Sequence, residues 1–396
     1  MVVDIPPEIL ARVLEIGVNQ WGIRYLSPVC LTCRDWNEIV VSNPRLWGII
    51  TIPAKLDSAR RKLLDLQLAK AKAAPLTLSV RSGTKPRDAV ARVLSLATNW
   101  VYADIPANLL GLTSGDLPNL QVLRLRNRES TPDSFSNEHP PSLSNLRSFA
   151  AYKVPARWIF SILNSAITSL ELSSQSWQIS QTLRMLTQVP NLVSLQLTAI
   201  SCQEVSPNTD TDIVSLEHLT RLEVSSVTDV SRLLNSIRAP ALHSVSIRDC
   251  RVPATDHDSL PLRVLFLQWG LSSFIPAHLH TLEIQESLVE GDAPFLGQWL
   301  KRLTSLNRLI LADVELERSI LTVLASSNPL LTQLFIEMED LDLEDLIAIA
   351  QARCTAYARL SVLQSVLCSS GSSEQLKELS CLVGELHCGC LGCSMK

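Results

Sequence analysis

The residues of this chain best suited to chemistry are cysteines and histidines. Near the C-terminus, Cys388, Cys390 and Cys393 are separated by small residues and leucine, and they follow His387. Thiolates and imidazoles are ligands that zinc prefers, and glycine permits the turn that would bring them together. A structural zinc site generally needs a further pair of ligands, and none follows this cluster. The pattern therefore favours free or lipidated thiols, although these three cysteines are the candidates for a metal site. We expect no cofactor.

The other reactive patterns are isolated. Cys30 and Cys33 have the spacing of a redox pair, but no strand–helix–strand pattern surrounds them, so we interpret them as small apolar side chains packed in a helix. His278 and His280 would share one face of a strand, and no cysteine or carboxylate completes a ligand set there. The sequence also has no strong Ser/His/Asp order, glycine-rich phosphate loop or carboxylate pair. We therefore expect no catalytic residue.

A repeated apolar phrase dominates the middle of the chain. Leu-x-x-Leu-x-Leu, with other apolar residues at some positions, recurs ten times, mostly at the spacing of about 20–29 residues that is typical of leucine-rich repeats. Each copy predicts a short strand whose named positions point into the core, followed by a looser return segment. The predicted fold is α/β, an irregular leucine-rich-repeat solenoid with a parallel β-sheet on its concave face. The copies begin at Leu120, Leu146, Ile167, Leu192, Leu219, Leu242, Leu262, Leu279, Leu306 and Leu331.

The first fifty residues have helical patterns instead. Pro6-Pro7 suits the first turn of a helix, where a missing N–H costs nothing. Helical spacing follows, and Ile9 and Ile16 widen the apolar face beyond the stripe to which Leu10 and Leu14 belong. A second helical stretch comes before the head ends. A head this small, with apolar residues on several faces, must pack within itself or be covered by a partner.

The patterns divide the chain into four parts. We predict a helical head over residues 1–50, a linking or capping helix over 51–75, a leucine-rich-repeat domain over 76–366, and a C-terminal cap or flexible cysteine-containing tail over 367–396. The linking helix is predicted from a stretch rich in Leu, Ala and Lys that ends before a proline. Two further apolar segments, 76–80 and 100–105, predict strands that open the repeat array.

The composition limits the class of partner and compartment. A net charge of −4 gives no reason to expect nucleic acid or an anionic membrane as a partner. No run of about 18 apolar residues occurs, so a membrane-spanning helix is not expected, and the first residues lack the features of a secretory signal. The ten cysteines are then expected to be reduced thiols of a cytoplasmic or nuclear protein.

The head contains, in this order, Ile5-Pro6-Pro7-Glu8-Ile9-Leu10, Val29-Cys30, Arg34 with Trp36, and Pro44-Arg45-Leu46-Trp47. This run of residues resembles an F-box. Followed by a helix and by leucine-rich repeats, it makes the chain similar to the F-box-like proteins of fungi, in particular of basidiomycetes. Two features depart from that pattern. Residues 17–26 form a longer stretch than the usual linker, and the Asn that commonly follows each repeat strand is missing, with only Cys250 fitting its position.

The resemblance implies a substrate-recognition subunit of a Skp–cullin–F-box type ubiquitin ligase. An F-box of this kind binds a Skp-type adaptor through apolar contacts, and the adaptor connects it to a cullin. The repeat domain would hold an unknown target protein near the ubiquitin-conjugating enzyme, so that this chain contributes proximity and no chemistry. The alternative is a repeat scaffold that binds its partner without a cullin complex. Carried over position by position, the adaptor contacts are Ile5, Pro6, Ile9, Leu10, Val29 and Cys30, while Trp36 and Trp47 brace the head.

The period of two along each strand predicts which side chains face outward from the sheet. Three apolar residues are expected to form a patch that binds the target, because exposed apolar clusters mark interaction sites. The alternative is that the C-terminal segment covers them as a cap. Four arginines on the same face would suit an acidic or phosphorylated segment of the target. These residues are Phe266, Ile310 and Phe335, with Arg124, Arg126, Arg221 and Arg248.

Overall fold

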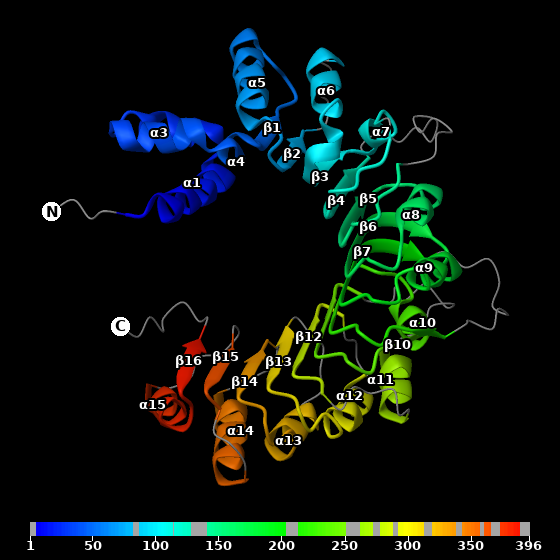
Figure 1. The fold of residues 1–396 in the computed structure, drawn as a ribbon. Coiled ribbons are helices and arrows are strands. Elements are labelled where there is room, and N and C mark those ends of the chain that lie inside the picture. Colours follow the sequence, from blue (N-terminus) through cyan, green and yellow to red (C-terminus); the bar gives the residue numbers. More distant parts are fainter. Residues whose placement is uncertain are drawn as a thin grey trace. The chain divides into compact units, whose positions relative to one another are not determined.

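The computed structural model of the chain consists of two compact units, residues 1–167 and 168–396, which we describe separately (Figure 1). No helix among the described residues is long and apolar enough to cross a membrane. The structure describes residues 5–81, 87–113, 115–127, 141–202, 213–250, 262–271, 278–287, 292–312, 319–337, 343–356, 360–365 and 373–388.

The first unit begins with a head of short helices. As predicted, Pro7 and Glu8 occupy the first turn of α1, which ends where Gly22 adopts a positive φ of 79°. Gly17 leaves room for the ring of Tyr25, which would overlap a side chain at that position. The indole of Trp47 donates a hydrogen bond to the carbonyl of Val40 over 2.8 Å, so it braces the head as expected. The elements are α1 (Pro7–Trp21), η1 (Ile23–Tyr25), α2 (Leu26–Cys30), α3 (Arg34–Ser42) and α4 (Pro44–Trp47).

A parallel sheet follows the head within the same unit. Its strands are paired in chain order, β1 (Ile49–Ile52), β2 (Leu76–Val80), β3 (Trp100–Pro106), β4 (Val122–Arg126) and β5 (Ser148–Tyr152). The connections contain α5 (Ser58–Ala71), α6 (Arg87–Leu94), η2 (Ala97–Asn99) and α7 (Ala107–Leu110), and α8 (Ala156–Ile162) follows β5.

The predicted boundary at residue 50 is wrong. Strand β1 begins at Ile49, and α5 connects β1 to β2 instead of linking a separate head to the repeats. Four residues are too few for an alternating pattern to be recognised beside the strong helical pattern that follows. The two predicted opening strands, β2 and β3, are confirmed.

The second unit continues the same architecture with nine described strands that are paired in parallel. They are β6 (Ser169–Trp177), β7 (Ser194–Cys202), β9 (Arg221–Ser225), β11 (Ser244–Arg248), β12 (Thr281–Gln285), β13 (Arg308–Ala312), β14 (Gln333–Ile336), β15 (Val362–Ser365) and β16 (Glu385–Cys388). A separate short pair consists of β8 (Val214–Ser215) and β10 (Ile237–Arg238).

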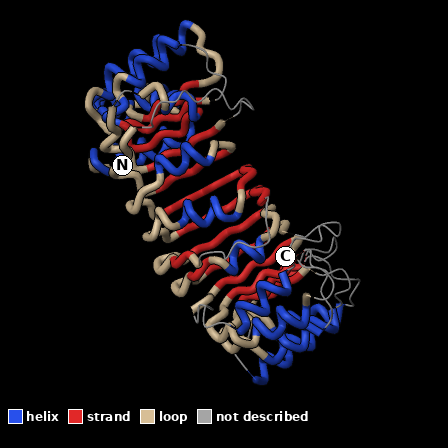
Figure 2. The backbone as a smooth tube through the Cα atoms, turned by 90° about the vertical axis from the view of Figure 1, so that its right-hand side faces the viewer, coloured by secondary structure: helices blue, strands red, loops and turns tan. Residues whose placement is uncertain are grey.

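Helices form most of the return segments of the second unit, and successive helices from α10 to α15 pack on one another. Figure 2 shows the strands of the second unit lying side by side and running parallel to one another. The helices are α9 (Ile179–Leu186), α10 (Val230–Asn235), α11 (Leu262–Leu271), α12 (Ala293–Leu300), α13 (Ser319–Ser326), α14 (Leu343–Ala356) and α15 (Ser373–Leu382).

Nine of the ten apolar phrases coincide with strands, which confirms the leucine-rich-repeat solenoid. In β12, for example, Leu282 and Ile284 are buried while the alternate residues face the other side of the sheet. The first leucine of a phrase closes a turn just before the strand, since its N–H donates to the carbonyl three residues earlier. Leu192 makes this bond to Val189, and Leu306 makes it to Leu303.

The phrase at Leu262 is the exception. It lies in α11, and β11 pairs directly with β12. Leu262, Leu265 and Phe266 also satisfy the helical spacing of one, four and five, and they are buried on one face of that helix. The interval of only 17 residues to the next phrase, below the usual range, was the sign that this copy is not a strand.

The predicted end of the repeats at residue 366 is also wrong. Helix α15 and strand β16 add another turn of the solenoid, because β16 pairs in register with β15. Part of the predicted tail is therefore sheet. Cys388 is the last residue of β16, while Cys390 and Cys393 lie outside the described residues.

Candidate functional site

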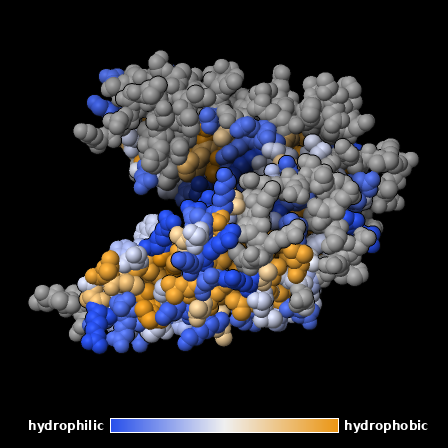
Figure 3. Space-filling model, turned by 90° about the horizontal axis from the view of Figure 1, so that it is seen from above, coloured by the Kyte–Doolittle hydropathy of each residue, from blue (hydrophilic) through white to orange (hydrophobic). Residues whose placement is uncertain are grey.

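Helix α1 of the head has apolar side chains on two sides. Leu10, which is 4% exposed, and Leu14 face the core of the head. Ile9 and Ile16 are each 56% exposed, and Val13 between them is half exposed. Steps of four and three residues place these three on one stripe of the helix. Figure 3 shows hydrophobic surface interspersed with hydrophilic surface over the described part of the face that is seen from above. We call Ile5, Ile9, Val13 and Ile16 the outer stripe.

The predicted adaptor contacts divide between the surface and the core. Ile5, Pro6 and Ile9 are exposed, and Cys30 is half-buried at the end of α2. Leu10 and Val29 are buried within the head, so they are corrected to core residues that hold its helices together. Periodicity alone does not say which of two apolar stripes faces inward, because both repeat every three or four residues.

Five exposed large apolar side chains of the head were not among the predicted contacts. Val13 and Ile16 complete the outer stripe, and Leu31, which is 84% exposed, follows α2. The other two are Trp21 at the end of α1 and Val41 in α3. The widened apolar face of the first helix was the available signal for Ile16. Leu31 gives no comparable signal, since a single leucine after a short helix fits a core position equally well.

The sheet of the second unit carries an ion-pair network on its outward side chains. The guanidinium of Arg248 on β11 donates to both carboxylate oxygens of Glu283 on β12, over 3.0 and 2.9 Å, and lies 3.5 Å from Glu223 on β9. The side-chain hydrogen bond that Arg248 donates to Glu283 raises the pKa of Arg248. Gln285 also donates to Glu283, over 2.6 Å. The charge of Arg248 is therefore neutralised within the sheet.

A second group lies on β13 and β14. Ile310 and Phe335 are register partners and are both partly exposed, so two of the three predicted patch residues are neighbours. The guanidinium of the exposed Arg308 lies 4.8 Å from the centroid of the Phe335 ring, a cation–π contact. Phe266 does not belong to this patch. It is 1% exposed in α11 and stacks on Trp299, which corrects the prediction that it faces outward.

The arginines predicted on the first unit have different environments. Arg126 on β4 forms an ion pair with Asp104 on β3, which neutralises its charge. Arg124 on the same strand is exposed. In the second unit, Arg221 at the start of β9 is exposed. Of the four predicted arginines, Arg124 and Arg221 are therefore better placed than the other two to meet an anionic partner.

At the position after a repeat strand, where leucine-rich repeats commonly have Asn, two successive repeats of this chain are joined by polar hydrogen bonds. The Cys250 N–H donates to the hydroxyl of Ser287 over 3.0 Å, and that hydroxyl donates to the carbonyl of Gln285 over 2.6 Å. The Cys250 thiol meets the carbonyl of Arg248 over 3.1 Å. Burial raises the pKa of this thiol to about 11. The sequence identified Cys250 for this position and missed Ser287, which takes part in the same hydrogen bonds one repeat later.

The described residues contain no group of three or more His, Cys, Asp and Glu side chains placed to hold a metal ion. His278 and His280 lie near a third histidine, His243, whose ring stacks on that of His280 at 5.3 Å. Cys30 and Cys33 are free thiols at the end of α2 and before α3.

Comparisons with known proteins give likenesses among solved structures. No protein-family model matches the chain, and no curated protein matches it. Among solved structures, the chain is similar to the one titled "Crystal structure of TLR13-ssRNA13 complex", with 15% sequence identity and a TM-score of 0.46. The match covers 79% of this chain and 42% of that chain, so this chain spans less than half of that protein's length.

Proposed function

We propose that this chain is the substrate-recognition subunit of a Skp–cullin–F-box type ubiquitin ligase. The observation that carries the proposal is the outer stripe of α1, an apolar helix face that the head itself leaves uncovered. The head would bind a Skp-type adaptor, and the adaptor would connect the chain to a cullin. The resemblance of residues 5–47 to an F-box supports the same partner.

Burial of the outer stripe is a reasonable source of binding energy. A fully buried Ile or Val side chain gains roughly 1.5–3 kcal/mol relative to an exposed one. The three residues Ile9, Val13 and Ile16 already have about half of their surface covered, so each would gain about 1 kcal/mol on docking. That sum is modest, and Ile5 and Leu31 would have to contribute for a stable complex.

The repeat sheet is the proposed target-binding surface. Repeat solenoids present extended faces for binding, and here the outward residues are mixed in character. Ile310 and Phe335 offer apolar contact, while Arg308 and Arg221 are exposed cations. A target segment with apolar and acidic side chains would suit this part of the sheet. The ligase chemistry would come from the other subunits, with the target held close to them.

A scaffold that acts without a cullin complex is the second candidate. It is favoured by the continuity of the head with the sheet, because α4 is followed directly by β1 and the two lie in one compact unit. Solenoids need polar or helical ends that cover the last apolar layer, and the head could serve this purpose alone.

Co-expression of the full chain with a fungal Skp-type adaptor separates these candidates. An F-box protein should form a stoichiometric complex that survives gel filtration, and Ile9→Asp with Val13→Asp should abolish it while the thermal unfolding midpoint changes little. Leu330→Asp is the matched control, since Leu330 is 56% exposed like Ile9 but lies in the second unit. Failure of the wild-type chain to bind the adaptor would contradict the proposed function and favour the scaffold that acts without a cullin complex. Leu10→Asp is unsuitable, because it would place a charge in the core of the head.

A further inference from the structure

A cavity of about 420 Å³ lies within the first unit, between the head and the first strand. Its walls come from the end of α1, η1, β1 and the segment after it, α5, and Arg81 after β2. The volume is in the range of pockets that hold small molecules, and is too small for a folded partner. Neither the proposed adaptor contact nor the repeat face uses this cavity.

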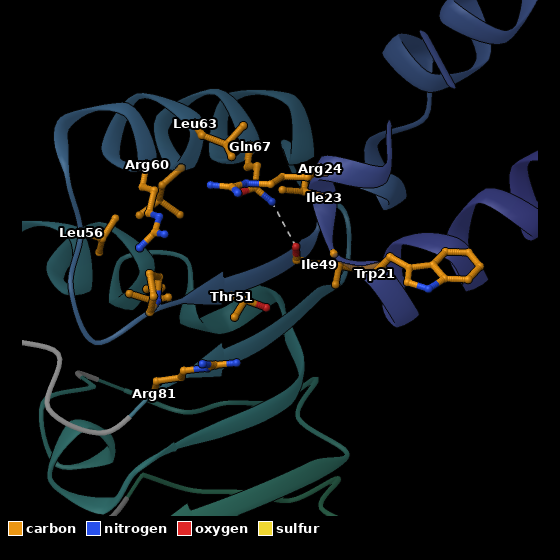
Figure 4. A pocket seen from close by; sticks show the side chains of 14 residues that line it. Trp21, Ile23, Arg24, Ile49, Thr51, Leu56, Arg60, Leu63, Gln67 and Arg81 are labelled. Carbon is orange, nitrogen blue, oxygen red and sulfur yellow. Dashed lines mark hydrogen bonds between the residues drawn. The ribbon is translucent and has the colours of Figure 1, made fainter. Parts of the chain in front are cut away.

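The charged residues that line the cavity are all cations. Arg24 of η1, Arg60 of α5 and Arg81 contribute to its walls, and no aspartate or glutamate is among its described lining residues. Figure 4 shows the side chains of Arg24 and Arg60 reaching into the same space, with Arg81 across from them. Arg60 donates a hydrogen bond to the Lys55 carbonyl over 3.2 Å and has an acidic neighbour, Asp57, at 3.7 Å. The side chains of Arg60 and Asp57 are 43% and 61% exposed, so water screens this ion pair. The cavity is therefore complementary to an anion.

The rest of the wall is mainly apolar. Ile49 and Ile52 of β1 and Leu56, Leu63 and Leu64 near or on α5 make up much of it. Guanidinium groups at the rim and aliphatic side chains behind them suit a ligand that has an anionic end and an apolar body. An inorganic anion alone would leave the aliphatic wall in contact with water.

The free edge of β1 adds a backbone element to the site. The carbonyls of Gly48 and Ile52 accept hydrogen bonds from β2, so the peptide groups of Thr51 point toward the opposite edge, where the cavity lies. At the same edge the side-chain amide of Gln67 donates to the Ile49 carbonyl over 3.1 Å. An extended peptide could not pair with β1 past this point, because that carbonyl is already occupied. A compact ligand fits this edge better than an added strand.

We propose that this cavity binds a small amphipathic anion, with a phosphate or carboxylate group held by Arg24, Arg60 and Arg81 and a short hydrocarbon chain or ring placed against β1 and α5. Charge-assisted and bidentate contacts from arginine would hold the anionic end. The aliphatic wall would supply the remaining affinity and exclude simple inorganic anions.

Isothermal titration calorimetry on the full chain tests the proposal with hexyl phosphate and hexanoate as probes. At least one of them should bind with one site per chain, and inorganic phosphate and hexyltrimethylammonium should each bind at least tenfold more weakly. Arg24→Gln with Arg60→Gln should weaken the bound probe at least tenfold. Arg61→Gln is the matched control, because Arg61 is an exposed residue of α5 that does not line the cavity.

Three results would overturn the proposal. One is the absence of saturable binding by both anionic probes. Another is equal binding of the cationic and anionic amphiphiles, which would indicate unspecific apolar adsorption. The third is unchanged affinity in the Arg24/Arg60 double variant when circular dichroism and thermal unfolding show that it is folded. None of these measurements involves the Skp-type adaptor, so their failure is separate from a failure of the proposed function.

Discussion

Replacement of Phe266 by alanine tests the placement of α11 directly. Phe266 is 1% exposed and stacks on Trp299 with ring centroids 5.4 Å apart, and Trp299 also meets Trp269 edge-on at 5.3 Å. Truncation would leave a cavity at the centre of this aromatic cluster. Phe→Ala substitutions in cores cost about 3–5 kcal/mol of unfolding free energy.

Phe335→Ala provides the matched comparison, because it removes the same side chain from a partly exposed position of β14. Its expected cost is about 1 kcal/mol, the ordinary size for a substitution that opens no cavity. Urea unfolding of both variants, followed by far-ultraviolet circular dichroism, measures the shift of the midpoint. A midpoint is preferable to an extrapolated free energy here, since long repeat arrays need not unfold in a single step.

The expected result is a several-fold larger shift for Phe266→Ala than for Phe335→Ala. Equal shifts, or a larger shift for Phe335→Ala, would refute the burial of Phe266. Such a result would instead agree with the strand that the sequence predicts over residues 262–267, in which Phe266 faces outward. The comparison therefore decides between two arrangements of the same segment.

Three further predictions concern polar groups of the second unit. The folded-state pKa of Cys250 is about 11, against the ordinary 9.0, so the unfolded chain releases the thiol proton at a lower pH than the folded chain does. The stability that the protonated thiol contributes is therefore complete below pH 9 and is lost as the pH rises to 11. The whole loss is about 2–3 kcal/mol. Chemical unfolding at pH 8.5 and 11 should show this loss in the wild type and less of it in Cys250→Ser. Arg353 is fully buried on α14 and donates to the carbonyls of Leu324, Ser327, Asn328 and Leu331 over 2.8–2.9 Å. Arg353→Met should therefore cost about 4 kcal/mol and raise hydrogen exchange in β14 to β16, and an unchanged exchange pattern would contradict this role. Glu283→Gln should cost at most about 1 kcal/mol in a melting experiment, because the Arg248 side chain is 41% exposed and its ion pairs are screened.

The repeat strands were predictable because two separate signals in the sequence mark each of them. The alternation of apolar and outward-facing residues predicts the strand, and the leucine before the strand closes a turn, as Leu306 does before β13. Where one of these signals is weak, prediction fails. Strand β1 has only four residues, and β16 lies in a cysteine-containing segment without a leucine triplet. The segment at Leu262 failed for a different reason, since its apolar spacing fits a helix as well as a strand.

The candidate surfaces were less predictable than the fold. Sequence position fixes that Arg248 and Arg126 face outward from their strands, but not that each meets a carboxylate on a neighbouring strand. Those partners lie 35 and 22 residues away, so the ion pairs depend on strand register. The cavity was not predictable at all. Its three arginines come from η1, from α5 and from the residue after β2, and only the folded first unit brings them together.

Exposed apolar side chains are concentrated in the head, and the proposed function depends on this distribution. Seven of the 14 large hydrophobic residues that are exposed in the described parts of the chain lie between Ile5 and Val41. Each repeat of the solenoid buries its apolar positions against its neighbours, so exposed ones such as Leu112 and Leu330 are isolated. A head that served only as a cap would need one apolar side, toward the sheet. Helix α1 has a buried stripe and an exposed one, and our proposal is that a partner covers the exposed stripe.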